Sequence, residues 1–135
     1  MLKIKCYESS SGKNEVQETY DSGTEELKAE LEVALAYLKV RNRQDWRRPH
    51  AHKMSKCKEF RNFFETRFFA NRLQQRPIGY FGPEENDFTI LIWATEKGNK
   101  LNPENWCGKS NRRREEIING NAKAKCLKLE GDPEC

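Results

Sequence analysis

The sequence lacks any apolar run long enough to cross a membrane. Its most apolar stretch, residues 88–95, is far shorter than the roughly 20 residues that a membrane-spanning helix needs. Residues 1–6 alternate charged with apolar side chains and contain no apolar signal-peptide segment. We therefore expect a cytoplasmic protein without a membrane partner.

Paired cysteine motifs and glycine-rich nucleotide loops are also missing. The chain has no C-x-x-C pair, no Walker-type loop, no G-x-S-x-G elbow and no dinucleotide fingerprint. Its five scattered cysteines favour reduced thiols over a disulfide framework, and their spacing from the two histidines fits no common zinc site. We expect neither a metal nor a cofactor. The five are Cys6, Cys57, Cys107, Cys126 and Cys135.

What the chain does contain is charge, and the positive charge is concentrated in its middle third. Of the 135 residues, 34% are charged and 36% hydrophobic, which suits one small domain, predicted over residues 1–120 with a C-terminal tail over 121–135. The formal net charge is +4, but residues 41–76 hold 11 basic and 3 acidic groups. Such a concentration favours a polyanion such as RNA as the partner, because phosphate binding releases counterions. A solvated basic loop without a partner is the alternative.

The pattern of apolar residues predicts an α+β fold with its helices on one face of a sheet. The expected order is an N-terminal strand, one or two helices, a three-stranded antiparallel meander and a C-terminal helix. The surest helix carries a leucine stripe, preceded by a possible capping box at Ser22 and Glu25. The predicted strands are 2–8, 60–70, 74–81 and 88–95, with a possible edge strand at 124–129; the predicted helices are 16–20, 23–41 and 102–119, the last capped by Asn102.

A row of cations follows the predicted meander. Antiparallel pairing would allow these side chains to converge on one face, where they would bind phosphate and stabilise the charge that develops when a ribose 2′-hydroxyl attacks it. The alternative is an ordinary charged sheet face. The row comprises Arg67, Arg76, Lys97 and Lys100, and the flanking candidates for RNA contact are Arg61, Arg72 and Tyr80.

Two histidines lie in the basic segment before the meander. His50 and His52 are candidates for proton transfer near neutral pH, although loop histidines often have no such role. Glu65 and Glu96 are a further possible acid–base pair, which nothing in their spacing demands. The cations around the histidines that are candidates for RNA contact are Arg47, Arg48 and Lys53.

Five segments, taken in order, resemble a known family. Residues 12–21 resemble the segment after its first strand, and Arg48-Pro49-His50 with Lys53-Met54 resembles its segment between helix and sheet. The other three are Phe64-Glu65-Thr66-Arg67-Phe68, Arg76-Pro77-Ile78-Gly79-Tyr80-Phe81 and residues 90–97 followed by Lys100 and Pro103. Together they resemble the phage-derived RelE/HigB-like toxins of the RelE/ParE superfamily. In place of that family's strand histidine, this chain has Ile92 or Trp93.

The resemblance implies the toxin of a type II toxin–antitoxin system, which cleaves mRNA on the ribosome or free of it and is silenced by an antitoxin protein. The family's arginines and lysines correspond to Arg67, Arg76, Lys97 and Lys100, and cleavage by 2′-hydroxyl attack requires no metal. Two alternatives stay open. One is a ParE-like topoisomerase poison without nuclease activity, and the other is a non-toxic phage-derived nucleic-acid-binding module.

Overall fold

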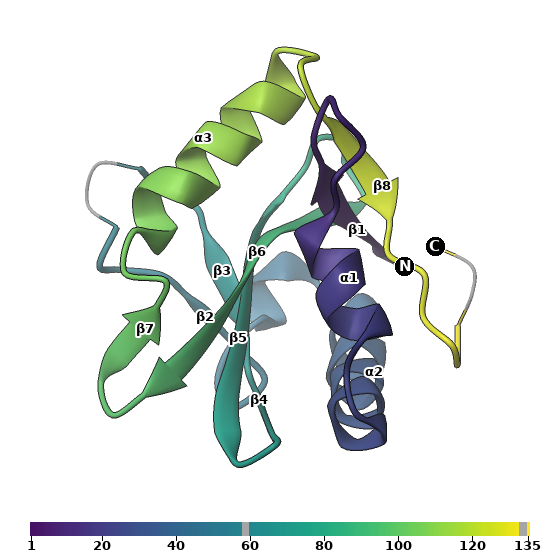
Figure 1. Cartoon of the computed structure of the whole chain (residues 1–135), viewed down its shortest axis with the longest axis vertical. Coiled ribbons are helices and arrows are strands. Elements are labelled where there is room, and N and C mark those ends of the chain that lie inside the picture. Colours follow the sequence, from purple (N-terminus) through teal and green to yellow (C-terminus); the bar gives the residue numbers. More distant parts are fainter. Residues whose placement is uncertain (58–59, 133–134) are drawn as a thin grey trace.

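The computed structural model describes residues 1–57, 60–132 and 135. Within them the chain forms a single sheet and three α-helices (Figure 1). The strands are β1 (Lys3–Glu8), β2 (Ala51–Lys53), β3 (Phe64–Thr66), β4 (Phe68–Ala70), β5 (Leu73–Phe81), β6 (Asp87–Lys97), β7 (Lys100–Asn102) and β8 (Lys123–Cys126). The helices are α1 (Glu15–Asp21), α2 (Glu25–Lys39) and α3 (Trp106–Ile118), and Arg43–Asp45 forms a 3₁₀ turn, η1.

The sheet is mixed and has eight strands among the described residues, in the order β2-β3-β5-β6-β1-β8. Strand β4 also pairs with β5, and β7 with β6. Strand β1 runs parallel to β6, whereas every other pair is antiparallel. The α+β class is therefore confirmed. The antiparallel path β3-β5-β6 lies inside a wider sheet, so the expected meander is only its centre.

The helices cover both faces of the sheet, which corrects the expectation that they lie on one. Helices α1 and α2 enclose one core with Ile90 of β6, and α3 encloses a second with Leu91. Neighbouring residues of a strand point to opposite faces, so Ile90 and Leu91 anchor the two cores. Strand β6 is consequently buried on both sides, which explains its nearly continuous apolar sequence.

Helix α2 matches the predicted helix closely. Its leucine stripe is buried against the sheet, as the spacing predicted. The helix begins after Thr24, whose hydroxyl accepts a hydrogen bond from the backbone N–H of Leu27 at 3.1 Å. Thr24 is thus the N-cap in place of the predicted Ser22. The stripe comprises Leu27, Leu31, Leu35 and Leu38.

Three boundaries in the second half of the chain differ from prediction. The strand expected at 60–70 is divided at Arg67 into β3 and β4, and residues 58–59 before it lie outside the described residues. The loop expected after residue 95 is instead the β6–β7 hairpin, which turns at Gly98 with a φ of 64°. Because Asn102 pairs with β6, it does not cap a helix, and α3 begins at Trp106.

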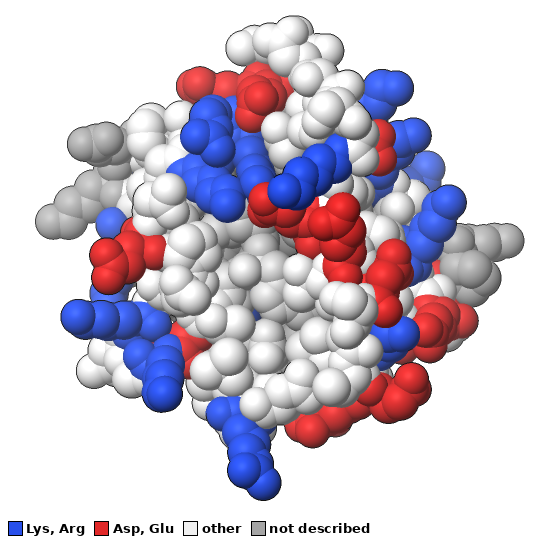
Figure 2. All heavy atoms as spheres, in the orientation of Figure 1, with Lys and Arg blue, Asp and Glu red and all other residues white. Residues whose placement is uncertain are grey.

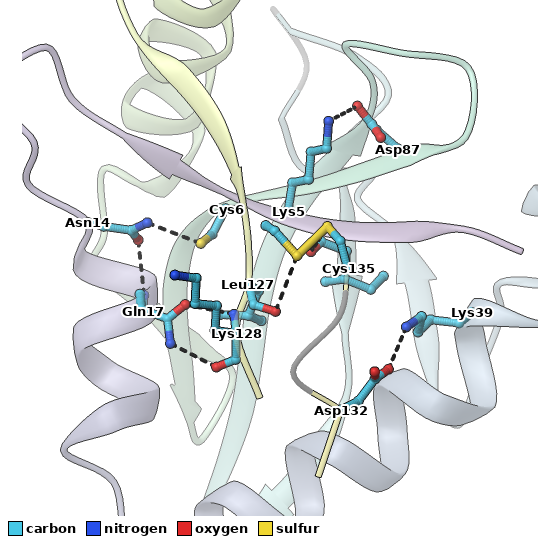
Figure 3. The surroundings of a disulfide bond; sticks show 12 residues. Lys5, Cys6, Asn14, Gln17, Lys39, Asp87, Leu127, Lys128, Asp132 and Cys135 are labelled. Carbon is cyan, nitrogen blue, oxygen red and sulfur yellow. Dashed lines mark hydrogen bonds and ion pairs between the residues drawn. A yellow bond between two sulfur atoms is a disulfide. The ribbon is translucent and has the colours of Figure 1, made fainter. Parts of the chain in front are cut away.

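The segment expected as a C-terminal tail joins the sheet. Strand β8 pairs with β1, and Leu127 and Leu129 beyond it are buried in the first core. Gln17 of α1 holds the backbone of Lys128 with two hydrogen bonds of 2.9 Å, one from its amide and one to its carbonyl (Figure 3).

Four of the five cysteines are paired, so the expectation of reduced thiols throughout is wrong. Cys126 bonds to Cys135 (Figure 3), and Cys57 bonds to Cys107 with 5.6 Å between their Cα atoms. The second bond ties the segment before β3 to α3 across 50 residues of sequence, a proximity that spacing alone does not reveal. Cys6 is free and fully buried, and burial raises the pKa of its thiol to about 11.

None of the helices in the described part of the chain is both long and apolar enough to cross a membrane.

Candidate functional site

A hollow of about 380 Å³ opens between β2, β3, the β6–β7 hairpin and the start of α3. Its volume suits a small ligand or one unit of a polymer. Its wall carries both signs of charge together with the imidazole of His52. The cations are Arg48, Lys56, Arg67 and Lys100, and the carboxylates are Glu65, Glu96 and Glu104.

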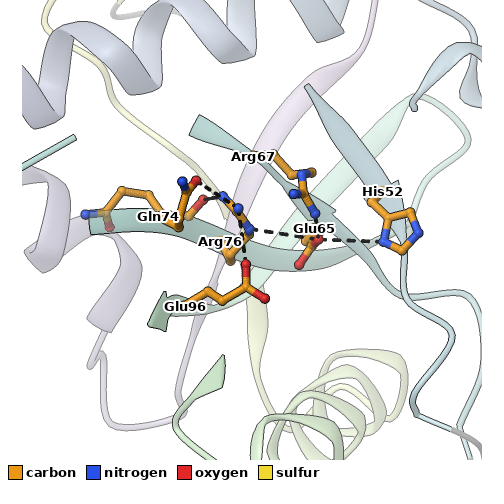
Figure 4. Close-up of polar contacts among 7 residues, drawn as sticks. His52, Glu65, Arg67, Gln74, Arg76 and Glu96 are labelled. Atoms are coloured by element: carbon orange, nitrogen blue, oxygen red, sulfur yellow. Dashed lines mark hydrogen bonds and ion pairs between the residues drawn. The ribbon is translucent and has the colours of Figure 1, made fainter. Parts of the chain in front are cut away.

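Glu65 is the centre of the polar contacts in this wall (Figure 4). Its Oε1 accepts a hydrogen bond of 2.6 Å from Nη1 of Arg67, which is two residues further along the chain. The same oxygen lies 3.7 Å from Nδ1 of His52 and 4.0 Å from Nε of Arg76. The β2–β3 register sets the first of these distances, because it places His52 directly opposite Glu65. The buried carboxylate therefore holds Arg67 by a hydrogen bond and lies close to His52 and Arg76.

Arg76 extends this set of contacts to β6. Its Nη2 donates to Oε1 of Gln74 at 2.9 Å and to Oε1 of Glu96 at 3.3 Å, while Nη1 donates to the carbonyl of Gln75. Burial and the neighbouring charge of Arg67 lower the pKa of Arg76, and the carboxylates oppose that effect. With only 3% of its surface exposed, Arg76 acts on the hollow through the groups that it holds.

His52, Glu65, Arg76 and Glu96 therefore form a row across β2, β3, β5 and β6, which are adjacent in the sheet. The arginine steps of the row join opposite charges at 4.0 Å and 3.3 Å, and the imidazole of His52 lies 3.7 Å from Glu65. The row puts an imidazole at one end and a partly exposed carboxylate at the other, with Glu65 and Arg76 between them and Arg67 beside Glu65 (Figure 4). This is the set of groups that proton transfer around a bound phosphate needs.

The sequence-predicted catalytic residues are only partly brought together. Arg67, Lys100 and His52 line the hollow, and Arg76 lies behind the wall. Lys97 is exposed in the β6–β7 hairpin, where it pairs with Lys100. It is not one of the described residues that line the hollow. His50 lies elsewhere, with its ring stacked on Tyr37 at 3.7 Å between ring centroids.

The predicted RNA-contacting residues fall in three places. Arg48 lines the first hollow. Lys53, Arg61 and Tyr80 line a second hollow near the end of α3. The remaining two, Arg47 and Arg72, are exposed, the latter in the β4–β5 turn with a φ of 61°.

Tyr80 is almost fully buried, which raises the pKa of its hydroxyl to about 12. That hydroxyl has no hydrogen-bond partner among the described residues. It is therefore a weak candidate for a surface contact and a structural part of the α3-facing core.

Two cations of α3 are paired with a carboxylate of α1. Figure 2 shows Lys and Arg side chains gathered over α3 with Asp and Glu side chains directly beside them. Arg113 bonds to Glu15 of α1 at 2.9 Å, and Lys109 lies 3.6 Å from the same carboxylate. These two cations therefore join α3 to α1.

Within the described residues, no three His, Cys, Asp or Glu side chains form a group that could hold a metal ion.

Sequence reasoning underrated two residues of these sites. Glu65 had a usable signal, because Glu65 and Arg67 are two apart in a predicted strand and so share a face. Arg114, which lines the second hollow, had no such signal in the sequence beyond its place in the run Arg112-Arg113-Arg114. Its contacts depend on how α3 docks on the sheet.

No protein-family model matches the chain, and the searches of curated proteins and of solved structures found no match either. Function is accordingly inferred from the fold and from the chemistry of this site.

Proposed function

We propose that this protein is a metal-independent endoribonuclease that cleaves mRNA at the first hollow, as the toxin of a type II toxin–antitoxin system of RelE/HigB-like type. The observation that carries the proposal is the row from His52 through Glu65 and Arg76 to Glu96 beside Arg67. It joins proton-transfer groups to phosphate-binding groups in one wall.

The proposed reaction needs no water and no metal. Glu96 takes the proton of a ribose 2′-hydroxyl, and the 2′-oxygen then forms a bond to the adjacent phosphorus. The bond from phosphorus to the 5′-oxygen breaks, and protonated His52 donates its proton to that leaving oxygen. The products are a 2′,3′-cyclic phosphate and a 5′-hydroxyl. Attack and departure occur on opposite sides of phosphorus, which fits a base and an acid at opposite ends of the row.

The cations divide between contact and positioning. Arg67 is partly exposed, so its guanidinium is available to the phosphate and to the negative charge that grows in the transition state. Lys100 and Arg48 line the same hollow and add charge for the flanking phosphates. Arg76 is a positioning residue, because its donors already hold Gln74, Gln75 and Glu96.

The order of elements supports the same proposal. A strand, two helices, an antiparallel strand path and a further helix follow one another in the order expected from the sequence, although the sheet around them is wider and mixed. The two helices carry the chain from β1 over the sheet before it returns as the strands that end in β6, the parallel neighbour of β1. An antitoxin protein and the ribosome are the partners that such a toxin would have.

One observation favours a second candidate, a non-toxic RNA-binding module without catalysis. Three carboxylates offset the four lysines and arginines in the wall, so the hollow attracts phosphate less strongly than a purely cationic one. In this reading, Glu65 and Glu96 serve only to hold Arg67 and Arg76 in place.

Cleavage of end-labelled mRNA by purified protein in excess chelator separates the two candidates. We expect fragments with 2′,3′-cyclic phosphate ends, no cut where the attacking ribose is 2′-deoxy, and growth arrest on induced expression. Arg67→Gln should remove both the fragments and the arrest. RNA that binds but stays intact, with normal growth, would exclude the nuclease and leave the binding module.

A further inference from the structure

A second hollow of about 660 Å³ lies between η1, β5 and the C-terminal half of α3. Four cations and one carboxylate line it, whereas the first hollow carries three carboxylates against four cations. The second hollow is therefore the more cationic of the two. Its cations are Arg43, Lys53, Arg61 and Arg114, and the carboxylate is Glu115.

Arg114 is held in place before any ligand arrives. Its Nη1 donates to the carbonyl of Arg61 at 2.7 Å, and its Nη2 donates to Oδ1 of Asn111 at 3.0 Å. Its guanidinium also lies 4.2 Å from the ring centroid of the buried Phe63. These contacts leave N–H donors of the guanidinium for a ligand, and a planar fork suits phosphate oxygens.

The wall of this hollow also presents a stacking surface. The guanidinium of Arg43 lies over the ring of Phe81 at 4.3 Å from its centroid. Both residues line the hollow, and Arg43 is exposed. Unpaired bases stack on such guanidinium planes and on aromatic rings, so Arg43 and Phe81 suit a nucleotide base as Arg114 suits a phosphate.

A third hollow, of about 420 Å³, lies beside the segment that follows β2. It shares Met54 and Ser55 with the first, and Lys53 and Arg61 with the second. The first and second hollows therefore both adjoin the third, on the side of the sheet edge that a bound polymer would follow between them.

We propose that the second hollow binds a phosphate and its neighbouring base of a single-stranded RNA whose cleaved phosphate lies in the first hollow. This inference rests on the proposed function for the identity of the ligand. The distal subsite then consists of Arg43, Lys53 and Arg114, and the natural ligand is an RNA strand of several nucleotides.

The test measures binding of RNA that cannot be cleaved, by fluorescence anisotropy with fully 2′-O-methylated oligomers. The site variant is Arg43→Gln with Lys53→Gln, two exposed residues whose loss should leave the fold intact. The charge-matched control is Arg112→Gln with Lys125→Gln, which are exposed on α3 and on β8. Thermal unfolding of each variant checks the fold, and Arg114→Gln is a third, independent variant.

For a dodecanucleotide we expect the site variant to bind about tenfold or more weakly than wild type, and the control to bind within about twofold. Its salt dependence should also be shallower, by about 0.7 in log–log slope for each lost phosphate contact.

Equal weakening by the site and control variants would overturn the subsite, because net charge would then explain binding. An RNA duplex that binds as tightly as the single strand would overturn it too. Failure of the nuclease proposal looks different: RNA stays intact, yet the variant-specific loss of dodecanucleotide binding persists.

Discussion

The Oε1 atom of Glu65 lies between Arg67 and His52, 2.6 Å from a guanidinium nitrogen of the first and 3.7 Å from Nδ1 of the second. Glu65 is 4% exposed, whereas the side chains of His52 and Arg67 are 35% and 23% exposed, so a buried carboxylate meets two groups that reach the solvent. The carboxylate bonds to Arg67 and lies close to His52, so it places a phosphate-binding group beside a proton-transfer group.

Replacing Glu65 with glutamine should therefore affect stability and cleavage together. The loss of a charged hydrogen-bond acceptor for Arg67 should lower the free energy of unfolding by about 2 kcal/mol. RNA cleavage should fall because His52 and Arg67 are no longer held. Urea unfolding and cleavage assays measure the two effects.

Glu85→Gln is the matched control, because Glu85 is exposed in the β5–β6 turn. It should change the free energy of unfolding by less than about 0.5 kcal/mol. If Glu65→Gln were as mild as this control in both assays, Glu65 would not organise the site.

The disulfide pairing predicts a definite thiol count. With five cysteines and two disulfides, protein unfolded without reductant should react with one equivalent of a thiol reagent. In the folded protein even that thiol, Cys6, should react slowly, because it is buried and its pKa is raised to about 11. A count of five after unfolding in non-reducing buffer would contradict the pairing.

Loss of the Cys57–Cys107 bond should destabilise the protein measurably. This bond closes a loop spanning 50 residues, so Cys57→Ser with Cys107→Ser should lower the free energy of unfolding by about 2–4 kcal/mol. Under reducing conditions the variant and the wild-type protein should be equally stable, because both then lack the Cys57–Cys107 bond and the Cys126–Cys135 bond. A variant as stable as the oxidised wild type would contradict the structural role of this bond.

Glu15 should contribute a pH-dependent part of the stability. Burial raises the pKa of its carboxyl, but the hydrogen bond and charge of Arg113 and the charge of Lys109 outweigh burial and leave the pKa below its ordinary 4.5. The contribution is therefore complete above pH 4.5 and is lost as the pH falls through the lower value of the folded state. Because 39% of the side chain is exposed, it should stay below about 1 kcal/mol.

Denaturant titrations of wild type and Glu15→Gln across this pH range measure the effect. The difference between their free energies of unfolding should shrink as the pH falls below 4.5. Glu18→Gln, exposed on the same helix, is the control and should show a smaller difference at neutral pH. A gap between wild type and Glu15→Gln that widened in acid would contradict the Glu15–Arg113 pairing.

Elements with strong local patterns were predictable from the sequence. Helix α2 carries a leucine stripe over four turns, which predicts a helix packed on a core. Strand β6 carries a nearly continuous apolar run, which is typical of a strand buried on both faces. The β6–β7 hairpin was not predictable in this way, since its strand residues after Thr95 are polar apart from Leu101 and resemble a loop.

The candidate site was predictable only in its composition. The residues Arg67, Lys100 and His52 were named from charge and chemistry, and all three line the hollow. Their meeting depends on the β2–β3 register and on the β6–β7 hairpin, which sequence spacing does not set. The same limit applies to the disulfide from Cys57 and to the hollow beside Arg114, because both depend on how α3 docks on the second face.

Cleavage by two histidine variants tests the central claim most directly. His52 lies in the wall of the first hollow, whereas His50, two residues away, is stacked on Tyr37. Under single-turnover conditions in excess chelator, His52→Gln should cleave RNA about 100-fold or more slowly than wild type, and His50→Gln should cleave within about threefold of it. Equal rates for the two variants, or no cleavage by the wild-type protein, would contradict the account.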